Sequence, residues 1–209
     1  MSQKYDLHMH STVSDGKLQP EELVDRAERL GLGLISITDH DRCDAYHELK
    51  KLAQINIELI VGIEFSTQWS GVGVHVLAYG CDIEHEVIQN LLASQTKSRL
   101  IRAELIAKRL EKQGLMGVIE WLDTRPDKTF IGRPDFARYL HATGQVKNVQ
   151  QAFKKYLGAG KVGDVKNSWV DIEQVIVSVN ESGGMAFLAH PSKYKLTNTK
   201  LKRLLTDFK

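Results

Sequence analysis

Hydrophobic side chains recur along this chain with two different periods, one typical of strands and the other of helices. Residues 20–31 carry apolar side chains three and four positions apart, which predicts an amphipathic helix that begins at Pro20 and ends at Gly31. A second helix is expected over residues 43–54. Because strands and helices alternate in the first part of the chain, the pattern predicts an α/β fold with βαβ units. Short apolar runs predict strands at residues 5–10, 34–38, 59–65, 72–79 and 185–189.

The pattern changes between residues 84 and 157, where leucine and isoleucine recur at helical spacing within a long charged stretch. Further helices are expected within it, at residues 133–140 and 149–157. A helical block of this size between strands is typical of an insertion, and it could close over a site as a lid. The sequence therefore predicts three parts: framework at residues 1–83, a helical lid or substrate subdomain at residues 84–157, and continued framework at residues 158–209.

A glycine-rich stretch follows the expected insertion. Residues 158–163 formally match the G-x-G-x-x-G pattern of dinucleotide-binding proteins. We reject that interpretation, because a helix rather than a strand is expected before the stretch and no helix clearly starts at Gly163. A flexible return from the insertion explains the glycines better, and helices are expected after it over residues 170–182 and 196–208.

Composition narrows the classes of function without choosing one. The 209 residues are 42% hydrophobic and 26% charged, which suits one globular domain with an insertion. A formal charge of +2 is too small to indicate nucleic acid or an anionic membrane as a partner, although it leaves room for a nucleotide substrate. Cys43 and Cys81 lack C-x-x-C spacing, so no disulfide framework is expected. With no signal-type segment before the first motif and no run that could span a bilayer, we expect a cytoplasmic protein without membrane or protein partners.

The first expected strand ends in two histidines, and a Ser-Asp-Gly sequence follows it. If this segment is a strand, His8 and His10 point the same way, together with Asp6, which could orient an imidazole. Gly16 allows the chain to turn, so Asp15 can come back over the end of the strand. Two imidazoles and a carboxylate at one strand terminus favour a metal site over the alternative of an ordinary surface or core histidine pair.

Every other expected strand also carries or ends in a potential metal ligand. His40 follows the second strand, Glu64 closes an apolar strand, His75 lies inside one, and His190 ends the last. A carboxylate that closes an apolar strand needs a partner, whereas His75 taken alone could be a satisfied core histidine. Nitrogen and carboxylate ligands without thiolates suit Mn²⁺, Zn²⁺ or Fe²⁺. The candidate metal ligands and catalytic residues are His8, His10, Asp15, His40, Glu64, His75 and His190.

These segments resemble the metal motifs of a known superfamily, the PHP (polymerase and histidinol phosphatase) superfamily, and most of all its TrpH/YciV-type branch. The resemblance covers essentially the whole chain, and its motifs are specific as a set. It implies a distorted (β/α)7 TIM-like barrel with up to three divalent metal ions, Mn²⁺ first among them. The motifs are His8-x-His10, Ser14-Asp15-Gly16, Thr38-Asp39-His40-Asp41, Gly62-Ile63-Glu64 and Leu188-Ala189-His190-Pro191.

The resemblance also implies how the ligands are shared and what the centre does. Members of this branch are phosphoesterases that remove the 3′-phosphate of nucleoside 3′,5′-bisphosphates, or degrade RNA and short oligonucleotides as 5′→3′ exonucleases. A hydroxide formed on the clustered cations would attack phosphorus in line. One metal would be held by His8, His10 and Glu64, a second by Asp15 and His40, and a third by Glu64, His75 and His190.

One part of the family pattern has no match in this sequence. The family supplies two further ligands from a C-terminal Asp-x-His, whereas here Asp207 is followed by Phe208 and Lys209. We therefore expect a barrel that is incomplete at its C-terminus. A non-catalytic PHP-like fragment is one alternative. An amidohydrolase-type C–N hydrolase is another, although the bridging lysine of that superfamily is not obvious here.

Cationic side chains outside the metal motifs are candidates to bind substrate phosphate. Arg133 and Arg138 lie in the expected insertion and could hold a phosphate bidentately. An ordinary helix surface is the alternative for both. Lys161, Lys166 and Lys193 are weaker candidates.

Overall fold

The computed structural model describes residues 4–52, 54–165 and 169–208. The chain divides into two compact units: Met1–Ser94 with Trp169–Lys209, called unit 1, and Gln95–Ser168, called unit 2. Each unit has its own cluster of buried hydrophobic side chains. The described strands all belong to unit 1, which therefore contains the strand ends on which the predicted metal site depends.

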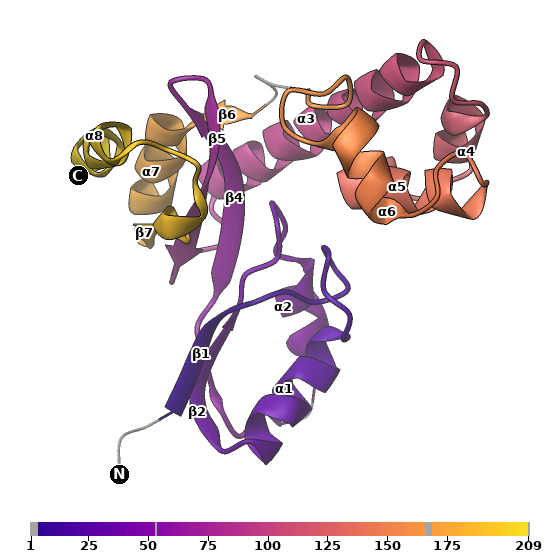
Figure 1. The fold of residues 1–209 in the computed structure, drawn as a ribbon. Helices are drawn as coiled ribbons and strands as arrows, with labels where there is room; N and C mark the ends of the chain where they lie inside the picture. Colours follow the sequence, from indigo (N-terminus) through magenta and orange to yellow (C-terminus); the bar gives the residue numbers. More distant parts are fainter. Residues whose placement is uncertain (1–3, 53, 166–168, 209) are drawn as a thin grey trace. The chain divides into compact units, whose positions relative to one another are not determined.

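The first sheet of unit 1 is wholly parallel. Its strands, in this order, are β1 (Lys4–Met9), β2 (Leu32–Ile37) and β3 (Glu58–Leu59), and the connecting helices are α1 (Pro20–Arg29) and α2 (Asp44–Leu49) (Figure 1). Helix α1 buries the apolar face predicted from its sequence, because Leu23, Val24 and Ala27 lie in the core. The start of the chain is therefore the expected βαβ unit.

The second sheet of unit 1 combines parallel and antiparallel strands. In the order β6-β4-β5-β7, its strands are β6 (Val170–Asp171), β4 (Gly62–Trp69), β5 (Val72–Tyr79) and β7 (Met185–Leu188). β4 and β5 form a hairpin, β7 runs antiparallel to β5, and β6 runs parallel to β4. Helix α7 (Ile172–Glu181) packs beside these strands (Figure 1). Helix α8 (Asn198–Asp207) is tied to β4 because Trp69 Nε1 donates to Asp207 Oδ2 over 2.9 Å.

The two sheets meet where the chain leaves β2 and where β4 begins. A parallel backbone bridge joins His40 to Glu64. The Asp41 N–H donates to the Glu64 carbonyl over 3.0 Å, and the Glu64 N–H donates to the Asp39 carbonyl over 3.2 Å. These bonds place the polar residues after β2 directly beside Glu64.

Several expected elements have different bounds in the structure. The helix predicted at residues 170–182 begins at Ile172, because Val170 and Asp171 pair with β4. The helix predicted at residues 43–54 ends at Leu49, because the next residues form tight turns. The strand predicted at residues 59–65 divides into β3 and the longer β4, because the chain leaves its pairing with β2 and pairs with β5 from Gly62 onward. Local hydrophobicity cannot show this change of partner, since pairing depends on strands that are distant in the sequence.

The regular elements described in unit 2 are all helical. Its core includes Phe136, Leu140 and Leu157, each fully buried. No helix begins at Gly163, which agrees with the rejection of a dinucleotide site there. None of the helices in the described parts of the chain has the length and apolar composition of a membrane span. The helices are α3 (Glu86–Glu111, which starts in unit 1), α4 (Val118–Asp123), η1 (Lys128–Phe130), α5 (Arg133–Ala142), α6 (Val149–Ala152) and η2 (Phe153–Leu157).

Candidate metal centre

The carboxylate of Glu64 lies at the centre of the site and is 1% exposed. Imidazole nitrogens from elements far apart in the sequence surround it. The distances to Glu64 Oε2 are 2.8 Å from His8 Nε2, 3.0 Å from His10 Nε2 and 3.7 Å from His40 Nδ1. The distances to Glu64 Oε1 are 2.8 Å from His75 Nδ1 and 2.9 Å from His190 Nε2.

Each of these imidazoles comes from a strand of unit 1 or from the residues that directly follow one. His8 lies near the end of β1 and His10 directly follows it. His40 follows β2, His75 lies on β5 beside β4, and His190 follows β7. The His190 backbone is left-handed, with a φ of +30°. Residues other than glycine rarely adopt this conformation, and where they do they are often part of a functional site.

Burial and interactions with neighbouring groups have opposing effects on the pKa values of Glu64 and His10, whereas burial dominates for His40. Burial disfavours ionisation of Glu64, but hydrogen bonds from His10 and His75 and the charges of neighbouring imidazoles hold its pKa well below the usual range. Burial lowers the pKa of His40 to about 4, so this imidazole is neutral at pH 7. Burial also acts against protonation of His10, but its hydrogen bond and charge interaction with Glu64 raise its pKa overall. The centre therefore pairs an ionised carboxylate with at least one imidazole in the neutral form that binds metal.

A cavity of about 340 Å³ opens onto these groups. Two buried imidazole nitrogens, His40 Nδ1 and His190 Nδ1, have no hydrogen-bond partner among the described residues. Unpartnered buried nitrogens are costly unless something else binds them. The residues that line the cavity are His8, His10, His40, Glu64, His75, His190 and Lys193.

The side chains fit divalent cations, which imidazole and carboxylate ligands bind without thiolates. Within each of three overlapping groups, the ligand atoms lie within 4.8 Å of one another. The group of His8, His10 and Glu64 is the one that the family resemblance implies for the first metal. The group around His75 contains His40 in the place where the resemblance implies His190. His190 nevertheless contacts the same Glu64 oxygen as His75. The groups are His8, His10 and Glu64; His10, Asp15 and His40; and His40, Glu64 and His75.

Asp15 is closer to solvent than the other predicted ligands, with a side chain that is 67% exposed. Its carboxylate lies 3.5 Å from His10 Nδ1 and 4.0 Å from His40 Nε2. Gly16 allows this return of the chain, since a β-carbon there would lie 2.0 Å from the His10 carbonyl oxygen. The glycine is therefore required for close backbone approach rather than for a left-handed turn.

Asp39 has a structural role in the site that the sequence did not reveal. Its carboxylate is buried and accepts the Ser11 N–H over 2.8 Å, the Ser11 hydroxyl over 2.6 Å and the Ser14 hydroxyl over 2.5 Å. These bonds fasten the loop between His10 and Asp15 to the end of β2. The signal that could have indicated this role is an aspartate that directly follows a buried strand, where a carboxylate needs donors.

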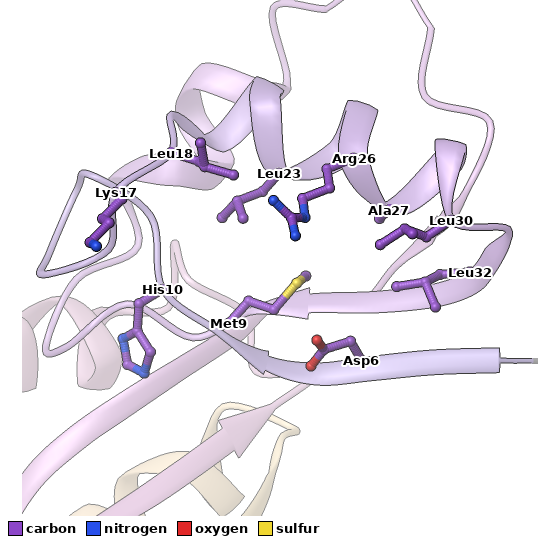
Figure 2. A pocket seen from close by; sticks show the side chains of 10 residues that line it. All are labelled: Asp6, Met9, His10, Lys17, Leu18, Leu23, Arg26, Ala27, Leu30 and Leu32. Carbon is purple, nitrogen blue, oxygen red and sulfur yellow. The ribbon is translucent and has the colours of Figure 1, made fainter.

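Asp6 does not join the histidines at Glu64, contrary to the prediction. Between Asp6 and Met9, β1 carries one extra residue relative to β2, because the pair Asp6–Ile35 is followed by the pair Met9–Ile37. Such a bulge changes which face the side chains occupy. Asp6 and Met9 instead line a second cavity of about 350 Å³ between α1 and the first sheet, whose lining also includes His10, as Figure 2 shows. The Asp6 carboxylate accepts the backbone N–H of His8 over 3.2 Å, not an imidazole proton.

The two arginines predicted to bind phosphate both lie in unit 2. Arg133 donates to the Leu157 carbonyl over 3.2 Å and to Asp164 Oδ1 over 3.3 Å. Arg138 pairs with Asp135 over 2.7 Å on the surface. The lysine predicted at position 166 falls outside the described residues, while Lys161 lies exposed in the turn after η2.

A third arginine of unit 2, which the sequence analysis did not single out, lies close to Arg133. Burial, and to a smaller extent the positive charges of Arg133 and Arg99, lower the pKa of Arg102 to about 10, against the opposing effect of Asp164. Unit 2 therefore places three arginines near one another, with Asp164 beside them. The spacing of Arg99 and Arg102 on α3 was the available signal, since residues three apart share a helix face.

Comparison with known proteins adds independent findings. The sequence profile of the PHP domain matches residues 6–162. A 5′-3′ exoribonuclease of Haemophilus influenzae is 41% identical over 210 residues, which cover 100% of this chain and 76% of that protein. A 3′,5′-nucleoside bisphosphate phosphatase of Chromobacterium violaceum is 36% identical, with 97% of this chain and 72% of that protein covered.

A solved structure also superimposes closely on this chain. It is described as an amidohydrolase from Chromobacterium violaceum with bound sulfate and no metal. The TM-score is 0.86 and the sequence identity 35%, with 98% of this chain and 73% of the other covered. Both sequence and structure therefore align over almost the whole chain.

Proposed function

Since the chain belongs to the PHP domain family and is a metal-dependent phosphoesterase, we propose that its substrates are nucleoside 3′,5′-bisphosphates or RNA and short oligonucleotides. The relatives named for these two activities support the proposal. The observation that carries it is the set of imidazoles around the buried carboxylate of Glu64, which is suited to cations that bind phosphate.

We propose that the residues that hold the cations are those predicted from the sequence. Their donor set accepts Mn²⁺, with Zn²⁺ and Fe²⁺ as alternatives. When bound, the cations supply a nucleophile from water at neutral pH and neutralise charge on the phosphate. Glu64 would offer both carboxylate oxygens to the cations, and the neutral imidazole of His40 would serve as a ligand. The proposed ligands are His8, His10, Asp15, His40, Glu64, His75 and His190.

We further propose that Arg133 binds substrate phosphate. The nearby charges of Arg99 and Arg102 support this role, because clustered guanidinium groups favour a polyanion. Arg138 remains a candidate with less support, since its guanidinium pairs with Asp135 at the surface.

Predictions about the barrel, the division of the chain and the cellular location belong to the same proposal. The distorted seven-stranded barrel is supported by the parallel order of β1, β2 and β3 and by the parallel bridge from His40 to Glu64. The division into residues 1–83, 84–157 and 158–209 remains a prediction. A cytoplasmic location agrees with two cysteines, Cys43 and Cys81, that are buried and free.

Metal analysis and hydrolysis assays of the purified protein test the function. We expect Mn²⁺-dependent release of phosphate from adenosine 3′,5′-bisphosphate, or of 5′-nucleotides from a short RNA. The variants His8→Ala, His40→Ala and Glu64→Ala should each lower bound metal and reduce turnover by at least about 100-fold. His47→Ala is the matched control, because His47 lies on α2 and contacts Glu84 rather than Glu64. Unchanged metal content and turnover in the three site variants would refute the proposal.

An amidohydrolase function is the second candidate, because the superimposed Chromobacterium structure carries that description. Release of ammonia from amides without release of phosphate would favour it. Absence of any hydrolysis with Mn²⁺, Zn²⁺ or Fe²⁺ would favour a non-catalytic binding module instead.

A further inference from the structure

Lys193 lines the cavity that contains Glu64, and we propose that its ammonium group binds the phosphate that is hydrolysed there. The proposal rests on the phosphoesterase function and deepens it by naming a residue that contacts the substrate. The other side chains that line this cavity are imidazoles and the carboxylate of Glu64. Lys193 is thus the lysine among the residues that line this cavity.

The backbone holds Lys193 between two anchored residues. His190 contacts Glu64, and the Lys193 N–H donates to the His190 carbonyl over 2.9 Å within the short helix η3 (Pro191–Lys193). On the other side, the Tyr194 hydroxyl accepts the His75 N–H over 2.8 Å, and its ring packs edge-on against His190 at 5.5 Å. The lysine is therefore carried by a segment that is fixed to the metal centre at both ends.

The ammonium group is available to an anion. No carboxylate forms an ion pair with Lys193 in the part of the chain that the structure describes, and this residue is exposed and lines the cavity. An ammonium carries three donors and no acceptor, so phosphate oxygens satisfy it well. A phosphate that reaches the Glu64 centre enters the same cavity of about 340 Å³.

This placement predicts a particular kinetic effect. A charge that binds a phosphate oxygen before and during the reaction stabilises the bound substrate and the transition state alike. Its removal should therefore raise KM about tenfold or more while kcat changes by less than about threefold.

The experiment compares Lys193→Met and Lys193→Arg with the wild-type protein. Inorganic phosphate is titrated by calorimetry into the metal-free and the Mn²⁺-loaded forms, and KM and kcat are measured in parallel. We expect Lys193→Met to weaken phosphate binding about tenfold in both forms, while bound Mn²⁺ and the thermal midpoint stay unchanged. Lys193→Arg should restore most of the binding, because it keeps the charge.

Lys195→Met is the matched control, since Lys195 is exposed two residues further along and does not line the cavity. It should bind phosphate as the wild type does. Phosphate affinity within twofold of wild type in Lys193→Met, or equal losses in Lys193→Met and Lys195→Met, would overturn the proposal. The phosphate titration does not require turnover. A protein that binds phosphate through Lys193 but hydrolyses no ester would therefore contradict the proposed function and leave the role of Lys193 intact.

Discussion

The buried carboxylate of Asp39 accepts three hydrogen bonds from the loop that follows β1. That loop carries Asp15, and the residue before it is His10, so Asp39 acts on the metal centre through the backbone. Ser11 is fully buried, and its N–H has the Asp39 carboxylate as its acceptor. At the scale of single residues, the positions of His10 and Asp15 thus depend on Asp39, although Asp39 forms no hydrogen bond with an imidazole among the described residues.

We expect Asp39→Ala to lower the free energy of unfolding of the metal-free protein by about 1–3 kcal/mol, because a buried N–H loses its acceptor. Mn²⁺ affinity should fall about 10- to 100-fold, as is typical when a group that orients metal ligands is removed. Urea unfolding and Mn²⁺ titration measure the two effects. Asp25→Ala serves as the control, since Asp25 forms only an exposed pair with Arg29 at 3.7 Å. Wild-type Mn²⁺ affinity in Asp39→Ala would contradict the proposed link between this loop and the site.

At the scale of elements, the junction between the two sheets depends on a hydroxyl from helix α2. The Tyr46 hydroxyl accepts the Ile37 N–H over 3.1 Å and the Gly62 N–H over 2.7 Å, and it lies 2.7 Å from the Ile37 carbonyl. It therefore joins the end of β2 to the start of β4, where the strands themselves do not pair along their length. Gly62 also permits the close approach, because a β-carbon there would lie 2.1 Å from Ser36 Oγ.

Tyr46→Phe should lower the free energy of unfolding by about 3 kcal/mol, since two buried backbone donors lose their acceptor while the ring remains. Urea unfolding measures this change. Tyr5→Phe is the matched control, because Tyr5 is 67% exposed and its substitution should change stability by less than about 0.5 kcal/mol. Equal stability of the Tyr46→Phe and Tyr5→Phe variants would show that the hydroxyl does not hold the sheets together.

At the scale of the whole molecule, the metal centre joins segments that are as far apart as His8 and His190. Cations that bind only when these segments are assembled should stabilise the folded chain. The buried Nδ1 of His40, which faces Glu64 and lacks a described hydrogen-bond partner, would then gain one.

Mn²⁺ at about 100 times its Kd should stabilise the protein by about 2.7 kcal/mol, which corresponds to a rise in Tm of about 5–10 °C for a chain of this size. Thermal unfolding followed by circular dichroism, with and without a chelator, measures the shift. Glu64→Gln should abolish it, because the variant keeps the shape of the side chain but removes its charge. A shift of the same size in Glu64→Gln would place the stabilising ions elsewhere.

Several helices and strands of this protein, and the position of most candidate ligands, can be predicted from local sequence patterns. Helix α1 and strand β5 follow from the spacing of their apolar residues, which reports directly which face is buried. The position of His8, His10, His40 and His190 at or just after strand ends follows from the same reading. Such features depend on neighbours within a few residues, so one sequence contains the information.

The remaining features depend on contacts between distant segments. The bulge that turns Asp6 away from the histidines comes from the register of β1 against β2. The anchoring role of Asp39, and the change of partner between β3 and β4, arise only when separate strands meet. The convergence of imidazoles on Glu64 was suggested by motif resemblance, but its geometry is set by the junction of two sheets. Periodicity along a chain reports which side of an element is buried, whereas register and partner choice are properties of pairs of elements.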